Sequence, residues 1–153
     1  MSRAVVLDAD LLGLVAQRHG IVPADACRQW IAAHVAAGTR LVVPSIADFE
    51  VRRELIRMNH QVGIARLDTF NTAAPDRYEV LTDAALQLAA QLWAQARNRG
   101  TPTGDPRELD CDVLIAEQAL SLGVPPADLL VATSNVGHLA QFVTADLWSN
   151  VLP

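Results

Sequence analysis

The stretch Ala4-Val5-Val6-Leu7-Asp8-Ala9-Asp10 decides the fold. Its first four residues are apolar and rich in β-branched side chains, which predicts a strand buried on both faces of a parallel sheet. That strand ends in a carboxylate, Asp8. Ligands of open α/β sheets bind outside the carboxyl ends of the strands, so Asp8 is expected at such a site. An Asp at a strand-to-helix junction also commonly caps the helix, and both roles stay open for Asp8 and Asp10.

The rest of the chain alternates short apolar runs with helical patterns. Further strands are predicted at 41–43, 78–81 and 129–132, with Phe142-Val143 and Leu147-Trp148 completing the sheet. Helices are predicted at 11–20, 23–38, 45–58, 61–71, 82–100, 109–123 and 136–139, with Ser45 as an N-cap and a loop at 101–108. This alternation, without two-residue hairpin signals, predicts an α/β fold: a central parallel sheet with helices on both faces.

Length and composition are those of one domain spanning residues 1–153. Hydrophobic residues make up 51% and aromatic residues 5%, so the core is built mainly from Ala, Val and Leu. Cys27 and Cys111 lack His partners at metal-ligand spacing and are predicted to be reduced core thiols. The sequence has no signal-peptide pattern and no apolar run long enough to span a bilayer, so a cytoplasmic location is expected.

Carboxylates and one amide from distant parts of the chain are expected to meet at one edge of the sheet. Asp8 and Asn135 follow strands, whereas Glu50 and Asp112 lie near the starts of helices. Crowded carboxylates repel one another unless a cation neutralises them. Because the donors are all oxygens, Mg²⁺ or Mn²⁺ fits better than Zn²⁺. Such ions activate water and stabilise charge on phosphate, so these residues indicate phosphodiester hydrolysis.

The same acids also have purely structural interpretations. Glu50 and Glu54 lie one helical turn apart among arginines, as on a solvated helix face held by ion pairs. Asp110 and Asp112 occupy the first turn of a predicted helix, where the helix dipole favours acids. These alternatives stay open for each acid taken singly.

Four blocks of this sequence resemble PIN-domain nucleases, the family that includes the VapC-type toxin ribonucleases. The blocks are Val6-Leu7-Asp8-Ala9-Asp10, Val43-Pro44-Ser45 leading to Glu50, Asp112-Val113-Leu114-Ile115-Ala116, and Val131-Ala132-Thr133-Ser134-Asn135 followed by His138. They occur in the expected order over nearly the whole chain, so the resemblance implies a single PIN-like domain.

The resemblance implies a catalytic triad of Asp8, Glu50 and Asp112 around Mg²⁺ or Mn²⁺, acting on RNA through an activated water. Thr133 and Asn135 match the family's Thr-x-Asp/Asn block, with Asn135 as a further metal ligand. Many members have Asp at that position, and an amide binds a cation more weakly, which puts a second metal site in doubt.

Two further acids are expected in the outer shell of the metal site. Asp10 stands where the family commonly has Asn. Asp110 competes with Asp112, and Asp112 is preferred because it directly precedes the apolar run of the motif.

Partners also follow from the resemblance: RNA as substrate, a homodimer, and a small antitoxin protein whose tail occupies the cleft. Three arginines on the helix of Glu50 are candidate RNA phosphate contacts, or else members of surface ion pairs: Arg52, Arg53 and Arg57. His138 is expected to be packed at the start of a helix rather than to act as a base. The other histidines are expected to be exposed: His19, His34 and His60.

Two other functions compete with the ribonuclease hypothesis. The first is a catalytically degenerate PIN-fold module that binds RNA or protein, an alternative suggested by Asn135. The second is a phosphatase-like enzyme with Asp8 as nucleophile and Asp10 as acid.

Overall fold

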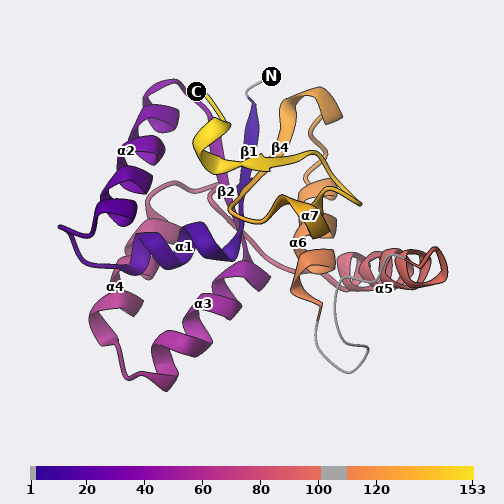
Figure 1. Ribbon diagram of the computed structural model, residues 1–153, viewed down its shortest axis with the longest axis horizontal. Coiled ribbons are helices and arrows are strands. Elements are labelled where there is room, and N and C mark those ends of the chain that lie inside the picture. Colours follow the sequence, from indigo (N-terminus) through magenta and orange to yellow (C-terminus); the bar gives the residue numbers. More distant parts are fainter. Residues whose placement is uncertain (1–2, 101–109) are drawn as a thin grey trace.

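A parallel β-sheet organises the chain in the computed structural model, which describes residues 3–100 and 110–153 (Figure 1). Within these residues the sheet has five strands in the order β3-β2-β1-β4-β5, and all neighbouring pairs are parallel. The strands are β1 (Ala4–Leu7), β2 (Arg40–Pro44), β3 (Tyr78–Glu79), β4 (Leu129–Thr133) and β5 (Ala145–Leu147). The predicted α/β class is confirmed, although residues 142–143 lie outside any strand.

Strand β1 lies at the centre of the sheet and is fully buried, as its apolar sequence predicts. It pairs with β2 on one side and with β4 on the other, with Leu7 opposite Ala132. The chain leaves β1 toward β2 and later returns to β4, so the order of strands reverses direction here. Such a switch point is where α/β sheets bind ligands, at the carboxyl ends of the strands.

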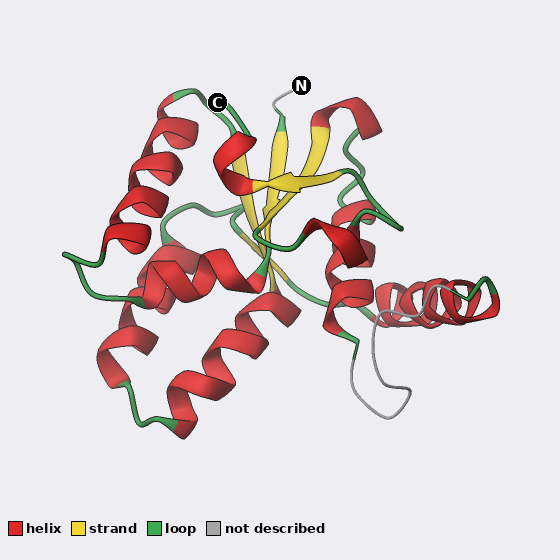
Figure 2. Ribbon diagram, viewed as in Figure 1, coloured by secondary structure: helices red, strands yellow, loops and turns green. Residues whose placement is uncertain are grey.

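Helices cover both faces of the sheet (Figure 2). They are α1 (Ala9–Ala16), α2 (Val22–Ala36), α3 (Ser45–Arg57), α4 (Gln61–Thr72), α5 (Asp83–Asn98), α6 (Cys111–Leu120) and α7 (Val136–Leu139), with short 3₁₀ turns at Pro126–Asp128 and Trp148–Asn150. The predicted loop at 101–108 lies outside the described residues. No helix in the described ranges is long and apolar enough to cross a membrane.

Ser45 does not cap α3, contrary to the prediction. The helix begins at Ser45, and Pro44 occupies the N-cap position. The Ile46 N–H donates instead to Oε1 of Gln118 on α6 (3.2 Å), while Oγ of Ser45 accepts the N–H of Leu81 (2.9 Å). A buried side chain from another helix therefore supplies the acceptor that the local sequence was expected to supply.

The prediction that His34 is exposed is wrong, because its side chain is completely buried on α2. Its Nε2 lies 3.0 Å from the carbonyl oxygen of Val151, which also accepts the indole N–H of Trp30 (2.8 Å). Burial lowers the pKa of His34. Cys27 and Cys111 are buried free thiols, as predicted.

Candidate active site

Asp8 caps α1, one of the two roles that the sequence left open, and it lies at the carboxyl end of β1. Its Oδ1 accepts the N–H of Ala9 (2.7 Å) at the start of α1, and its Oδ2 accepts the hydroxyl hydrogen of Thr133 (2.6 Å) at the end of β4. Only 8% of Asp8 is exposed. Burial is the main cause that raises the pKa of Asp8 to about 6, and the charges of Asp10 and Asp112 raise it as well. The hydrogen bond from Thr133 acts in the opposite direction and lowers it.

Asp10 ties the first turn of α1 to the segment that follows β4. Its Oδ1 accepts the N–H of Leu11 (2.8 Å), and its Oδ2 accepts the N–H of Ser134 (2.6 Å). The charge of Asp10 acts on both Asp8 and Glu50, raising the pKa of each. Asp10 is therefore part of the acidic cluster that we define as Asp8, Asp10, Glu50 and Asp112.

Glu50 belongs to this cluster, whereas Glu54 does not. Burial raises the pKa of Glu50 most, the Cys111 thiol lowers it by donating a hydrogen bond, and the charges of Asp112 and Asp10 raise it further. Glu54, one turn later on α3, pairs with Arg57 (2.8 Å) in solvent. The solvated-face interpretation thus fits Glu54, while Glu50 turns toward the strand ends.

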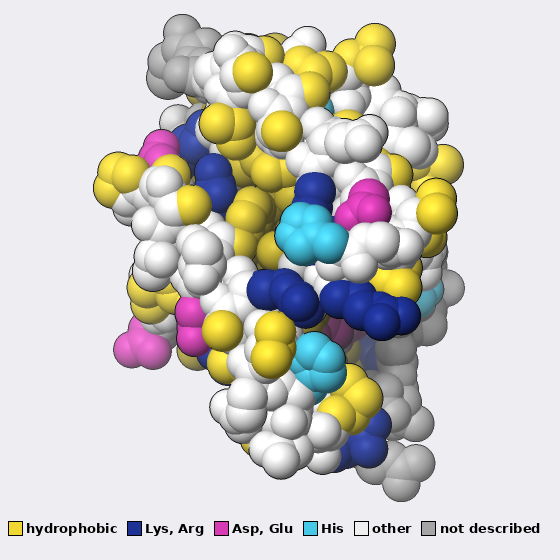
Figure 3. Space-filling model, turned by 90° about the vertical axis from the view of Figure 1, so that its left-hand side faces the viewer, with side chains coloured by type: hydrophobic (Ala, Val, Ile, Leu, Met, Phe, Trp, Pro, Cys, Tyr) yellow, Lys and Arg dark blue, Asp and Glu magenta, His cyan; other side chains and the backbone are white. Residues whose placement is uncertain are grey.

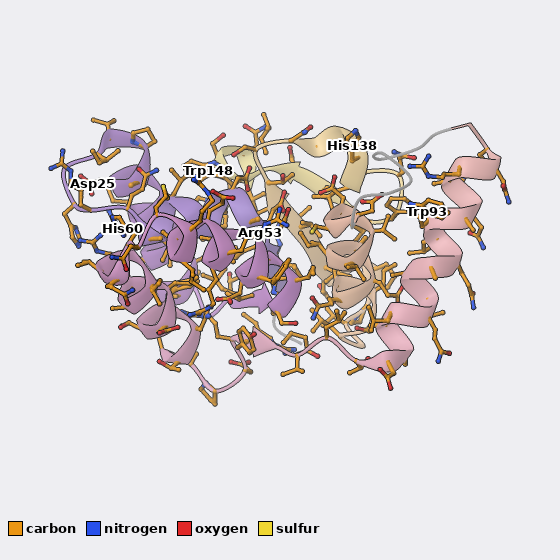
Figure 4. All side chains as sticks on the ribbon, turned by 90° about the horizontal axis from the view of Figure 1, so that it is seen from below. Asp25, Arg53, His60, Trp93, His138 and Trp148 are labelled. Carbon is orange, nitrogen blue, oxygen red and sulfur yellow. The ribbon has the colours of Figure 1, made fainter. Side chains whose placement is uncertain are left out.

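Asp112 lies in the first turn of α6 and contacts His138 of α7. Its Oδ2 is 3.1 Å from Nδ1 of His138, whose side chain is 46% exposed (Figure 4). His138 lies in the short helix α7 and is partly buried there, and in addition it contacts Asp112. Sequence reasoning missed this contact, although His138 follows the Thr133–Asn135 block by one helical turn.

The two acids that start α6 have different surroundings. Asp110 is the N-cap residue, its Oδ1 accepts the N–H of Val113 (3.3 Å), and burial raises its pKa. Asp112 is the one whose charge raises the pKa of both Asp8 and Glu50. These interactions agree with the preference for Asp112.

Asn135 lies at the N-cap of α7, close to the contact between Asp8 and Thr133. Its N–H donates to Oγ1 of Thr133 (3.0 Å), and its side chain makes no capping hydrogen bond within the described residues. Oγ1 of Thr133 therefore accepts from Asn135, and its hydroxyl hydrogen has two acceptors within reach, Oδ2 of Asp8 (2.6 Å) and the more distant carbonyl oxygen of Asn135 (3.3 Å).

The three arginines of α3 differ in their surroundings. Arg52 binds Asp48 with two nitrogens (2.7 and 3.0 Å) and also pairs with Asp68 (2.6 Å). Arg57 pairs with Glu54 in solvent. Arg53 lies over the ring of Phe49 (5.4 Å), and its charge lowers the pKa of Glu50. Arg53 is thus the arginine of this helix whose charge acts on a member of the acidic cluster.

The cluster does not form a closed metal cage. Among residues 3–100 and 110–153, no three His, Cys, Asp or Glu side chains are arranged so that they could hold a metal ion. The donors present are nevertheless the carboxylate and amide oxygens that suit Mg²⁺ or Mn²⁺. Burial first and neighbouring acidic charges second raise the pKa of Asp8 and of Glu50, and a dication bound here would favour their ionised forms.

The order of strands and the surrounding helices define a PIN-like α/β fold. No protein-family model matches the chain, and no curated protein matches its sequence. Several solved structures match the chain in fold, among them chains of VapBC2, FitAcB and FitAB.

A chain of VapBC2 from Rickettsia felis, solved bound to a DNA fragment from their promoter, aligns with a TM-score of 0.71 and 14% identity over 95% of this chain and 98% of that chain. A chain of FitAcB from Neisseria gonorrhoeae aligns with a TM-score of 0.64 and 15% sequence identity, and the alignment covers 96% of this chain and 99% of that chain. A chain of FitAB bound to an IR36 DNA fragment aligns with a TM-score of 0.68 and 14% sequence identity, and the alignment covers 97% of this chain and 98% of that chain.

Proposed function

We propose that this protein is a Mg²⁺- or Mn²⁺-dependent ribonuclease that hydrolyses RNA phosphodiester bonds. The observation that supports the proposal is that Asp8 follows β1 at the switch point of the sheet and that the charge of Asp112 acts on both Asp8 and Glu50. Each of these acids interacts electrostatically with at least one other, and two of them have raised pKa values. A site that crowds negative charge in this way favours a dication.

Asp8, Glu50 and Asp112 are the ligands we assign to the metal, with Asn135 as a further oxygen donor, and their side chains would have to close around the ion because they form no metal-binding group within the described residues. A bound metal supplies an activated water and stabilises charge on the phosphate. The chain's own residues orient the ligands: Thr133 donates to Asp8, and His138 contacts Asp112. Hydrogen bonds of this kind fix ligand orientation and strengthen metal binding.

Arg53 supplies a positive charge beside the acidic cluster, where the backbone of a bound RNA would pass. It is exposed and stacked on Phe49, and it makes none of the ion pairs that engage Arg52 and Arg57. Guanidinium groups bind phosphate with two parallel hydrogen bonds. Of the three candidate contacts, Arg53 is therefore the one we assign to an RNA phosphate.

We also propose that the chain is the toxin of a toxin-antitoxin pair, because its structural neighbours were solved as VapBC and FitAB complexes. A groove of about 460 Å³ has walls from α1, α2 and α4. Its apolar floor includes Val15, Ile31 and Phe70, and Arg28 and Arg66 line it too. Figure 3 shows hydrophobic and arginine side chains on this face. An amphipathic, acidic segment of an antitoxin fits such a groove.

We further propose a homodimer, which light scattering of the purified protein tests.

Cleavage of labelled RNA by purified variants tests the ribonuclease function. Asp8→Asn and Asp112→Asn are each expected to abolish cleavage in Mg²⁺ or Mn²⁺ and to remain folded. Asp83→Asn, an exposed acid in the first turn of α5, is the matched control and keeps activity. Retained cleavage in Asp8→Asn or Asp112→Asn would remove the proposed site, as would full activity of the wild type in EDTA.

A degenerate binding module is the second candidate function, and two observations favour it. Asn135 replaces a carboxylate that many PIN domains have, and the described residues contain no closed metal-binding group. Titration with Mn²⁺ separates the two candidates. The ribonuclease proposal expects the melting temperature of the wild type to rise with millimolar Mn²⁺, whereas unchanged melting with retained RNA binding supports the module.

A further inference from the structure

A pocket of about 440 Å³ opens beside the acidic cluster, between α1 and α3. Its apolar walls come from small residues of α1 and larger residues of α3, namely Ala9, Gly13, Ala16, Val51, Leu55 and Met58. Asp10 and Glu50, two members of the acidic cluster, also line it. The pocket reaches Gln17, which lies about 10 Å from Asp10 along the helix axis. It is therefore continuous with the acidic cluster and extends well beyond it.

The carboxylates that line the pocket already have donors. Asp10 accepts two backbone N–H groups (2.8 and 2.6 Å), and Glu50 accepts the thiol hydrogen of Cys111. Glu54 pairs with Arg57 (2.8 Å). A cationic side chain would have to compete with these contacts, whereas a neutral group can contact the apolar walls without disturbing them. The apolar walls can therefore take an uncharged group, while the acidic cluster at the end of the pocket remains the proposed cation site.

Two polar side chains could hydrogen-bond the edge of such an occupant. Gln17 carries an amide with both donor and acceptor atoms. Nδ1 of His60 accepts the N–H of Gly63 (2.9 Å), so the neutral ring carries its hydrogen on Nε2 as a donor. Figure 4 shows His60 at the junction of α3 and α4. Apolar walls with a few polar groups are typical of pockets for small organic groups.

We propose that this pocket takes one unpaired nucleobase of the RNA whose scissile phosphate lies at the acidic cluster. The inference rests on the proposed ribonuclease function and adds to it a binding site for a base next to the cleaved bond. Proteins that recognise RNA by sequence usually bind bases turned out of a single strand, by contacts to their faces and edges. A pocket beside the phosphate site therefore gives this protein a preference at one nucleotide position.

Gly13 allows the pocket to be filled without damage to the fold. It lies in the middle of α1 with an ordinary helical backbone, and a Cβ atom there meets no atom within 4 Å. Leucine favours a helix more than glycine does. Gly13→Leu therefore places a side chain in the pocket while α1 is kept. Ala33→Leu, on an exposed face of α2, is a matched control outside the pocket.

The test is an abasic scan of a short single-stranded RNA that the wild type cleaves. Each base in turn is replaced by a hydrogen, and affinity is measured by fluorescence anisotropy with Ca²⁺ in place of Mg²⁺. Removal of the base at one position is expected to weaken binding about tenfold, since a hydrogen bond and the apolar contact of a single base contribute on this scale. Gly13→Leu should weaken binding of intact RNA by a similar factor and should remove the effect of that abasic position, while Ala33→Leu binds like the wild type.

Two results would overturn the pocket assignment: no single sensitive position in the wild type, or an unchanged abasic effect in Gly13→Leu. If Gly13→Leu does not fold, the scan of the wild type still decides. The response of the melting temperature to Mn²⁺ distinguishes a failure of the pocket assignment from a failure of the proposed ribonuclease function. Gly13→Leu should keep the Mn²⁺ response that Asp8→Asn loses. A wild type with neither a Mn²⁺ response nor RNA cleavage would refute the ribonuclease function and this inference together.

Discussion

Asp8→Asn should make the metal-free protein more stable at neutral pH. Burial, together with the charges of Asp10 and Asp112, raises the pKa of Asp8 from its ordinary value of 3.8 to about 6. The folded state therefore binds this proton more tightly than the unfolded state does. The resulting stability is fully present below pH 3.8 and is lost as the pH rises through about 6. The difference between the two pKa values corresponds to about 3 kcal/mol.

Asparagine removes the free-energy cost of holding an ionised carboxylate at this buried position, but its side chain keeps only one acceptor oxygen. The carboxylate accepts two hydrogen bonds, from Ala9 and from Thr133, so the variant loses one of them at a cost of about 1 kcal/mol. The net gain at pH 8 is about 2 kcal/mol, or a rise of roughly 4–8 °C in melting temperature for a domain of this size. Near pH 4 the gain vanishes, and the variant should be less stable than the wild type by about 1 kcal/mol.

Urea unfolding in EDTA between pH 4 and 8 measures this difference. Asp83→Asn, an exposed acid of α5, is the control and should differ from the wild type by only a few tenths of a kcal/mol at every pH. Saturating Mn²⁺ should reverse the order, because a ligand at 100 times its Kd stabilises the wild type by about 2.7 kcal/mol. A metal-free Asp8→Asn that is less stable than the wild type at pH 8 would refute the reasoning.

Three further substitutions test other contacts. His138→Ala removes the partner of Asp112 and should weaken Mn²⁺ binding by roughly 10–100-fold in calorimetry, and unchanged affinity would contradict the orienting role. Gln118→Leu leaves the buried N–H of Ile46 without its acceptor and should cost about 2 kcal/mol in urea unfolding. Gly63→Ala would put a Cβ 2.4 Å from a side-chain nitrogen and should lower stability by about 1–3 kcal/mol, whereas an unchanged melting temperature would show that the neighbour moves freely.

Local sequence predicted those parts of the fold in which each element's own pattern decides. The apolar run of β1 and the hydrophobic spacing of the helices depend on residues a few positions apart. Ser45 and His34 were misjudged because their surroundings come from far along the chain. The start of α3 is capped by Gln118, and His34 is buried under the carbonyl group of Val151. A single sequence carries no signal for contacts at such separations.

The acidic cluster was predictable because one geometric rule places it: parallel strands bring their carboxyl ends to one edge of a sheet. The contacts that each acid of the cluster makes were harder to predict from the sequence. The contact of His138 with Asp112 depends on how α7 packs on α6, which no local pattern fixes. One partner of Arg52, Asp48, stands four residues away and is visible as a helical pair, but Asp68 of α4 is not.

The hydrogen bond between Thr133 and Asp8 joins residues 125 positions apart. A nascent chain emerges from the ribosome with its N-terminus first, so the three acids Asp8, Glu50 and Asp112 all emerge before β4 does. A growing polypeptide therefore carries these acids without the strand that holds the first of them. For a ribonuclease of the proposed kind, a chain cut short before β4 would have all three acids but would lack the hydroxyl group that holds Asp8.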